Sequence, residues 1–345
     1  MAAISIEGFE TGSVTQSSTI ATGGGGFQFV TGRDGIGVAI RGGSGTVSST
    51  VTRLFSSESD IIYVHLGVFI SSTQFGLTLG QSPILYIQAD NGAVSHLSVT
   101  FDATGHAQLR RGQASATILA TSANAISADA WRSVEFKARI HDTLGEFILK
   151  FDGTEYINFT GDTKNGGTST RPDRLVLITR TSPQGHAWDD LFICDTSGME
   201  NNTWTGEVSI TGIKPAGNGA NSDLVGSDGN SVDNYLQVDE YPLNTSDYNA
   251  STTTGDLDTY DMSAVGKIGT VLAVQDLTYA AKSDSGPKSF KHVMRASGGT
   301  MVKSDEVALS TTYSLYAGPI WITDGDGEGW TITKVNSHEF GFEVV

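Results

Sequence analysis

Two adjacent carboxylates, Asp189 and Asp190, follow Trp188 in an apolar stretch and are the side chains that most resemble an acid–base pair. Glycoside hydrolysis requires two carboxylates at a fixed separation in a groove. The stretch Trp188–Asp195 alternates as a β-strand does, however, and neighbouring side chains of a strand point to opposite faces of the sheet. Without a bulge the two carboxylates cannot serve one site. The pattern therefore predicts architecture rather than chemistry: the last strand of a first module and the hinge into a second.

A second acidic group, in which Asp324, Asp326 and Glu328 are separated by glycines, has the composition of a calcium-binding loop. Carboxylate oxygens are ligands that Ca²⁺ prefers. The full EF-hand spacing is missing, because no glutamate stands at the position of the bidentate ligand. The pattern favours an acidic turn between Trp321 and Trp330, with calcium binding as the alternative.

The histidines, the cysteine and the glycine-rich stretches give no catalytic pattern. The seven histidines are scattered, without zinc-ligand spacing or a nucleophile arrangement. His65 lies inside an apolar run and is expected to be a hydrogen-bonded structural residue. Cys194 is the only cysteine, which excludes an intrachain disulfide and favours a small buried side chain. Gly23–Gly26 and Gly42–Gly45 are expected to be turns. The sequence thus predicts neither an enzyme nor a bound cofactor.

Most elements around these residues are predicted to be short β-strands. Ile61–Ile70 is the most apolar run and suits a strand that is buried on both faces. Across Ala130–Ile140, apolar and polar residues alternate, so one face is expected to cover a core while the other, with Glu135 and Arg139, meets water. Residues 215–260 are long and polar, which predicts an ordered loop or an arm that clasps a partner.

Five aromatic residues fall in or next to this polar region and are expected to be exposed. Exposed rings anchor neighbouring subunits or stack on sugars; anchoring of a neighbouring subunit is favoured, and sugar binding stays open as the alternative. The five are Trp204, Tyr235, Tyr241, Tyr248 and Tyr260.

The charge of the chain excludes several classes of partner. The formal net charge is −17; up to residue 204 there are 13 Lys+Arg and 19 Asp+Glu (−6), and after it 8 and 19 (−11). Such a surface repels phosphate backbones and anionic membranes, so neither nucleic acid nor a membrane is expected as a partner.

The N-terminus lacks the features of a signal peptide, and no apolar run is long enough for a membrane span. We expect a protein made in the cytoplasm that reaches the outside, if at all, as part of a larger particle.

The segment Trp131–Gly153 resembles part of a known fold. A strand of the form Trp-x-x-Val-x-Phe is followed by a hairpin and by Phe-x-Leu-x-Phe-Asp-Gly. This arrangement is similar to the laminin-G/concanavalin-like jelly roll, and the resemblance covers about residues 1–197. It implies a β-sandwich whose binding sites lie on loops and differ between members, some of which bind calcium or sugars.

Further segments resemble, in order and approximate spacing, structural proteins of tailed bacteriophages. The resemblance implies a virion component, without placing it on the head, the tail or a fibre. The segments are Trp188–Asp195, Trp204–Ile210, Gln237–Pro242, Gly255–Tyr260, Leu309–Tyr313 and Val335–Val344.

The sequence therefore predicts an all-β chain of two β-sandwich (jelly-roll) modules, residues 1–197 and a smaller 205–345 that contains the polar loop 215–260. The favoured function is a structural component of a tailed-phage particle, in capsid decoration or in the tail or fibre. It would act through contacts with other virion proteins and with copies of itself, and a trimer is the leading oligomer. The alternative is a tail adhesin that binds a receptor or host-surface glycan, and a glycan-degrading enzyme ranks below it.

Overall fold

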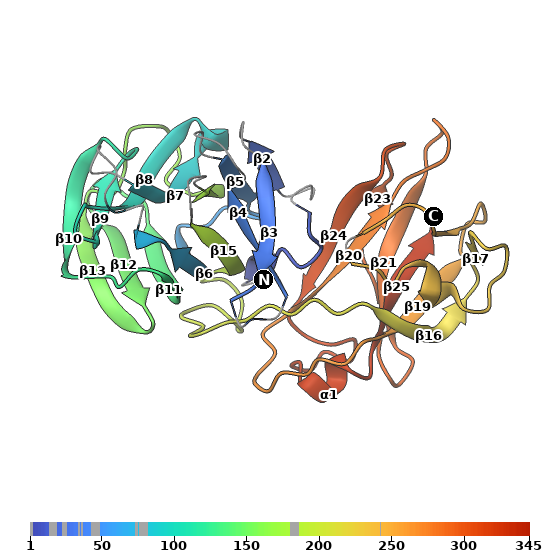
Figure 1. The fold of residues 1–345 in the computed structure, drawn as a ribbon. Coiled ribbons are helices and arrows are strands. Elements are labelled where there is room, and N and C mark those ends of the chain that lie inside the picture. The colour runs from blue at the N-terminus through green and yellow to red at the C-terminus, as the bar shows by residue number, and fades with distance from the viewer. Residues whose placement is uncertain are drawn as a thin grey trace. The chain divides into compact units, whose positions relative to one another are not determined.

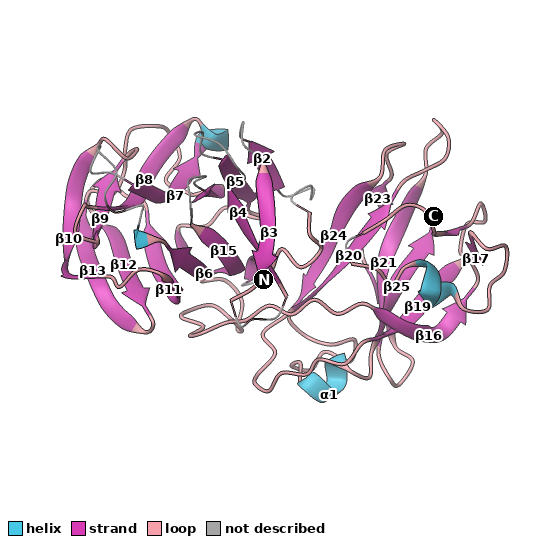
Figure 2. Cartoon of the chain, in the orientation of Figure 1, coloured by secondary structure: helices cyan, strands magenta, loops and turns pink. Residues whose placement is uncertain are grey.

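The computed structural model describes residues 3–13, 19–22, 26–33, 35, 37–42, 49–72, 75, 82–179, 186–241 and 243–345. These residues are nearly all β-strand, turn and loop, which confirms the predicted fold class (Figures 1 and 2). The described residues contain no helix with the length and hydrophobicity that crossing a membrane requires. The turns expected at Gly23–Gly26 and Gly42–Gly45 lie for the most part outside the described residues.

The chain divides into two compact units. Unit 1 comprises Met1–Glu10 and Ser18–Ile210, and unit 2 comprises Thr11–Ser17 and Thr211–Val345. Residues 196–210, which follow the strand expected to end the first module, thus belong to unit 1.

Unit 1 is a sandwich of two antiparallel sheets. The first sheet has eight strands, and β1 (Ala3–Glu7) pairs with β15 beside its main path. The second sheet has seven strands. In spatial order the first sheet runs β13 (Thr154–Gly161), β12 (Gly145–Phe151), β11 (Ala130–Arg139), β6 (Ile61–Ile70), β15 (Ala187–Asp195), β4 (Val38–Gly42) and β3 (Phe27–Thr31). The second runs β10 (Thr117–Ala125), β9 (His106–Arg111), β8 (Val94–Phe101), β7 (Ser82–Ala89), β14 (Arg174–Thr179), β5 (Ser49–Leu54) and β2 (Thr19–Thr22).

Every second residue of the central strands forms the core between these sheets. Val64, Leu66, Val134 and Phe136 are almost fully buried on the inner face of the first sheet, as the alternation over Ala130–Ile140 predicts. The sheets also meet through polar groups in the core, because Trp188 Nε1 of β15 donates a 2.9 Å hydrogen bond to a backbone carbonyl of β14. The alternate side chains of these strands point to the outer face of the eight-stranded sheet.

Unit 2 is built on a six-stranded antiparallel sheet and a two-stranded ribbon. The ribbon packs against the sheet, because the Trp321 and Phe340 rings lie 6.0 Å apart and share a buried cluster with Trp330, Met294 and Val335. The sheet runs β16 (Pro215–Ser222), β19 (Leu257–Met262), β25 (Glu339–Val344), β21 (Ser289–Arg295) and β22 (Met301–Lys303), with β23 (Val307–Ala308) also on β21. The ribbon is β20 (Val274–Ala280) and β24 (Ser314–Trp321), and a short α1 (Ile332–Val335) precedes β25.

The polar region 215–260 of unit 2 is an ordered part of this architecture. It contributes β16, the small pair β17 (Val225–Gly226) and β18 (Asn249–Ala250), and a 3₁₀-helix, η3 (Asn234–Gln237). The buried carboxylate of Asp258 in β19 binds this region to the sheet. It accepts hydrogen bonds from the Leu224 backbone N–H and from the side chains of Asn234 and Tyr260. Because a buried carboxylate is stable only with such donors, these contacts hold the polar region in place.

Candidate functional site

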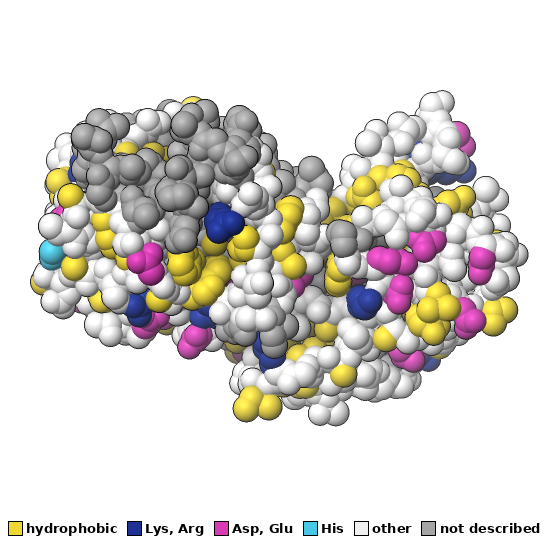
Figure 3. All heavy atoms as spheres, viewed as in Figure 1, with side chains coloured by type: hydrophobic (Ala, Val, Ile, Leu, Met, Phe, Trp, Pro, Cys, Tyr) yellow, Lys and Arg dark blue, Asp and Glu magenta, His cyan; other side chains and the backbone are white. Residues whose placement is uncertain are grey.

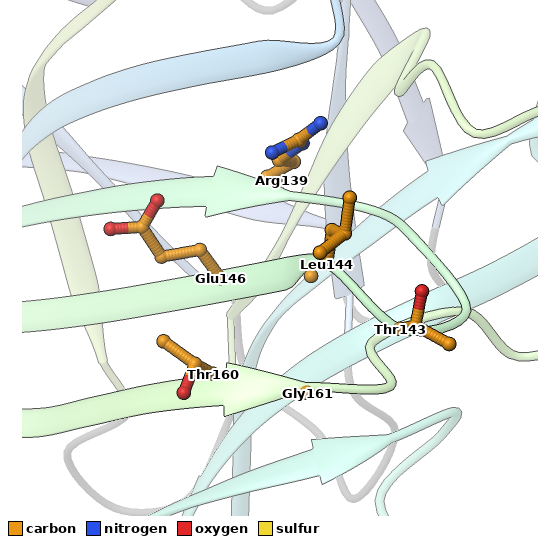
Figure 4. Close-up of a pocket in the computed structure, with 7 residues that line it drawn as sticks. Arg139, Thr143, Leu144, Glu146, Thr160 and Gly161 are labelled. Carbon is orange, nitrogen blue, oxygen red and sulfur yellow. The ribbon is translucent and has the colours of Figure 1, made fainter.

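A shallow depression of about 380 Å³ lies on unit 1 where β11 and β13 end and β12 begins (Figure 4). Its walls combine charged, hydroxyl and apolar side chains. The lining residues are Arg139, Thr143, Leu144, Gly145, Glu146, Thr160 and Gly161.

Strand register brings the polar residues of the depression together. Arg139 of β11 is paired with Glu146 of β12, and Glu146 with Thr160 of β13. Directly opposed residues of antiparallel strands share a face, so the three form one row across the sheet. Gly145 and Gly161 are the next pair, and a side chain at Gly145 would lie 2.5 Å from the Gly161 carbonyl oxygen. The strands therefore approach closely at this end only because of the glycine.

The turn from β11 to β12 presents an apolar side chain at the edge of the depression. His141 Nδ1 accepts hydrogen bonds of 3.0 Å from the backbone N–H groups of both Thr143 and Leu144, and the Thr163 hydroxyl accepts one from the His141 N–H. These bonds fix the turn. The Leu144 side chain is 60% exposed and lies beside Arg139 (Figure 4).

The two charged residues of the row differ in their partners. Glu146 forms a 2.6 Å ion pair with Lys137, which lies two residues before Arg139 on β11. Its carboxylate points away from the Arg139 guanidinium (Figure 4). In the part of the chain that the structure describes, Arg139 has neither an ion pair nor a side-chain hydrogen bond. The depression thus contains a guanidinium group whose donors are unused.

Sequence reasoning placed Arg139 on a polar strand face but did not identify this depression. The opposition of Arg139 and Glu146 follows from a hairpin register that needs the turn 140–144, and Thr160 joins them only through the next hairpin. The signal that was present is the apolar Leu144 inside an otherwise polar turn. Neighbouring positions of a strand pattern do not reveal such a cross-strand row.

The structure brings Asp189 and Asp190 together, and the expectation that they point to opposite faces is wrong. β15 is bulged against β6 between Asp189 and Phe192, and Asp190 adopts a φ of 51°. A bulge adds a residue and redirects the side chains around it. As a result both carboxylates face Arg33: Asp189 accepts from its backbone N–H and Asp190 from its Nε, each at 2.8 Å.

The Asp189–Asp190 pair lies under residues 203–210, here called the covering segment. Three alternate N–H groups of this segment donate to side chains on three adjacent strands: Gly206 to Glu135 of β11 (2.9 Å), Val208 to His65 Nε2 of β6 (3.2 Å) and Ile210 to Asp190 of β15 (2.6 Å). Arg33 also donates to the Val208 carbonyl and pairs with Glu207.

The covering segment corrects the expectation that Glu135 meets water. Glu135 is only 7% exposed, because the segment lies over it on the outer face of the sheet. Trp204, another residue of this segment, packs edge-on against Tyr63 and lies under the Lys150 ammonium.

Burial shifts the ionisation of this cluster. It raises the pKa of Asp189 to about 7, with the neighbouring Asp190 charge adding to the effect. It lowers the pKa of His65 to about 3, with the positive charge of Arg33 adding to the effect. His65 is therefore neutral at physiological pH and structural, as predicted from its apolar surroundings. Asp189 and Asp190 are 3% and 2% exposed, so a substrate has no access to them.

Cys194 is a buried thiol, as its apolar neighbours predict. Burial raises the pKa of this thiol to about 12, and the adjacent Asp195 charge contributes. The reactive thiolate is therefore scarce at physiological pH.

In the acidic loop 324–328 of unit 2, the carboxylates pair with the ammonium group of a lysine. Lys334 Nζ lies 2.6 Å from Asp324 Oδ2 and 2.7 Å from Glu328 Oε2. The other oxygen of Asp324 accepts the N–H groups of Asp326 and Glu328, which makes the loop a tight turn. Among the described residues there is no group of three or more side chains arranged to hold a metal ion. The ammonium group of Lys334 thus lies between the carboxylates of Asp324 and Glu328 and pairs with both.

Of the five aromatic residues expected at the surface, two are exposed: Tyr241 (42%) and Tyr248 (44%). Trp204 and Tyr235 are half-buried. For Tyr260 the expectation is wrong, because its hydroxyl donates to the buried Asp258 and accepts from Asn249. On the face drawn in Figure 3, some hydrophobic side chains are exposed among acidic ones.

No family model and no curated protein sequence matches this chain. Among solved structures, domain 4 of AbnA, a GH43 extracellular arabinanase from Geobacillus stearothermophilus, is similar at 15% identity, over 56% of this chain and 93% of that one, with a TM-score of 0.39. A Bacillus subtilis protein of unknown function with a galectin-like fold matches at 11% identity over 56% and 96%, with a TM-score of 0.40. A sialidase matches at 11% identity and a TM-score of 0.39, and the match spans 56% of this chain but only 18% of that one.

Proposed function

We propose that this chain is a carbohydrate-binding protein without catalytic activity, and that the depression where β11 and β13 end and β12 begins binds the glycan. The observation that carries the proposal is the combination of an exposed apolar side chain, Leu144, with a row of polar groups on the adjacent strands. A sugar ring has an apolar C–H face and a rim of hydroxyl groups. Leu144 can cover the former, while the Thr143 and Thr160 hydroxyls and the Arg139 donors bind the latter.

The arrangement of carboxylates supports binding rather than hydrolysis. A glycosidase of the common type needs two carboxyl groups flanking the scissile bond. Among the residues that line the depression only Glu146 is acidic, and it is paired with Lys137. The carboxylates of Asp189 and Asp190, which the sequence singles out as a possible acid–base pair, are buried under the covering segment.

A role in a tailed-phage particle stays a prediction from the sequence resemblance, as do virion partners and a trimeric assembly. A glycan-binding unit carried on such a particle corresponds to the adhesin alternative. Glycan binding does not depend on that location and is tested with the isolated chain.

The test is binding of the full chain to a glycan array, followed by affinity measurements on the ligands found. The variant Leu144→Ala should bind about five- to tenfold more weakly, since about 1 to 1.4 kcal/mol of apolar contact is lost. Ile118→Ala is the matched control, because Ile118 is an exposed hydrophobic residue of the other sheet, 45% exposed and outside the depression. Absence of binding to every glycan, or equal loss in both variants, would overturn the proposal. Release of shortened sugars from a bound glycan would contradict its non-enzymatic part.

A further inference from the structure

We infer that the glycan bound at this depression carries a carboxylate group and that Arg139 receives it. The inference rests on the proposed function and adds the chemical class of the ligand. A guanidinium group presents planar donors that match a carboxylate in a two-pronged hydrogen bond. Arg139 offers these donors without a protein partner among the described residues, at the wall of a depression large enough for a sugar residue.

Lys137 is the reason that Arg139 is free. Glu146 stands directly opposite Arg139, and such a cross-strand position normally produces an Arg–Glu pair. Lys137 lies diagonally across from Glu146 and binds its carboxylate at 2.6 Å. Because one acid stands between two bases, one positive charge of the row is left without a partner.

The charges around the row do not cancel that surplus. Lys164 is paired with Asp142 at 3.7 Å, and Arg111 with Asp162, so each of these bases has its own acid. The net charge of −17 belongs to the whole chain. At physiological ionic strength, charges further apart than a Debye length of about 8 Å are largely screened. The local excess at Arg139 therefore decides which charge the depression attracts.

A carboxylate on the ligand would pair with Arg139 as the Glu146 carboxylate pairs with Lys137. The ligand's acid takes the place beside Arg139 that Glu146 gives up to Lys137. Its sugar ring then lies against Leu144, with the Thr160 hydroxyl on the far side of the row. Glycans of this class contain uronic or sialic acids.

The experiment compares matched acidic and neutral ligands on the full chain. Oligogalacturonate, alginate, hyaluronan oligosaccharides and sialyllactose are each tested beside the same glycan after reduction of its carboxyl groups. Wild type should bind at least one acidic form about tenfold more tightly than its reduced form, the gain from one charge-assisted pair. This preference should fall as salt is raised, while the affinity for the reduced form stays constant.

Variants on β11 assign the preference to one side chain. Arg139→Gln should lower the affinity for the acidic form to that of the reduced form, and Arg139→Lys should retain part of the preference. Arg132→Gln removes the same charge from the same strand, from an arginine already paired with Asp152, and should change either affinity less than twofold. The salt dependence of wild type tests the inference even if a variant fails to fold.

The outcomes separate this inference from the proposed function. Equal binding of acidic and reduced forms by wild type overturns the inference and leaves glycan binding intact. Equal weakening of both forms by Arg139→Gln, or equal affinity for a sulfated glycan without carboxylates, also overturns it. Binding of neither form of any glycan is the failure of the proposed function itself.

Discussion

Two regions of the outer face of the eight-stranded sheet, one around Glu135 and one around Arg139, share strand β11 and differ in what covers them. Glu135 and Arg139 lie on one face of β11, four residues apart. At the Glu135 end the covering segment donates its alternate N–H groups to Glu135, His65 and Asp190. At the Arg139 end the charged row borders an open depression. The difference shows that polar side chains of one strand face are bound by the chain itself at one position and left open at another, and we propose that the open one binds a ligand.

The largest effect is expected at the covered end. Asp190→Ala leaves the buried Arg33 Nε and the Ile210 N–H without their acceptor, and should destabilise unit 1 by about 3–5 kcal/mol, as loss of one partner of a buried ion pair does. Asp60→Ala, which breaks an exposed pair with Arg171, should cost less than about 1 kcal/mol. Native-state hydrogen exchange of β6 and β15 measures unit 1 alone. Equal costs for both variants would refute the structural role of the cluster.

The second effect concerns pH, because His65 and Asp189 shift in opposite directions. The lowered pKa of His65, from 6.5 to about 3, gives stability that is present above pH 6.5 and is lost as the pH falls toward 3. The raised pKa of Asp189, from 3.8 to about 7, gives stability that is present below pH 3.8 and is lost as the pH rises to 7. Between pH 4 and 6.5 the two slopes oppose each other.

Removing either group should therefore expose the slope of the other. From pH 4 to 6.5 the stability of Asp189→Asn relative to wild type should rise by about 1.4 kcal/mol per pH unit, while that of His65→Gln should fall by about the same amount. Urea unfolding of the two variants and wild type at several pH values, followed by hydrogen exchange in unit 1, measures the stability of each variant relative to wild type. Slopes of the same sign would contradict the assigned ionisation states.

At the open end, Lys137→Met tests whether Lys137 keeps Arg139 available. Without its lysine, Glu146 should turn to the opposing Arg139, and the affinity for an acidic glycan should fall about three- to tenfold, or about 1 kcal/mol. The double variant Lys137→Met/Glu146→Gln removes the competing acid and should restore binding. Titration calorimetry with both proteins decides the matter, and a double variant as weak as the single one would show that Lys137 contacts the ligand itself.

The smallest effect extends the comparison to unit 2, where Lys334 occupies the acidic loop. Lys334→Gln removes the ammonium group from between Asp324 and Glu328. Calcium at about twice its Kd should then stabilise unit 2 of this variant by about 0.6 kcal/mol and leave wild type unchanged. Thermal unfolding with Ca²⁺ and, as a control, Mg²⁺ measures this. Stabilisation of wild type by Ca²⁺ would mean that the loop binds the metal despite the lysine.

Period-two patterns predicted the strands well, because burial on one face is a local property of the sequence. Ile61–Ile70 is β6 and Ala130–Ile140 contains β11, and the apolar positions of the alternating pattern over Ala130–Ile140 lie in the core. The bulge at Asp190 could not be predicted from the local sequence, because Asp190 binds Arg33, which lies 157 residues away in the chain. The same holds for Tyr260, whose burial depends on a network that Asp258 forms with residues of a distant loop.

The candidate site was predictable only in its parts. The polar face of β11 includes Arg139, and that much follows from alternation. The pairing of Glu146 with Lys137 rather than Arg139, and the position of Thr160, follow from two hairpin registers. Registers depend on turn geometry and packing together, and neither is visible at a single position.

The most direct test of glycan binding at the open end is a hydrogen-exchange footprint of the full chain with and without a saturating bound glycan. We expect slower exchange at the backbone amides of Thr143 and Leu144, and in the segments 139–146 and 159–161. Exchange in the covering segment and in unit 2 should be unchanged. Protection confined to the covering segment or to unit 2, with none at residues 139–146, would show that the glycan does not bind at the depression.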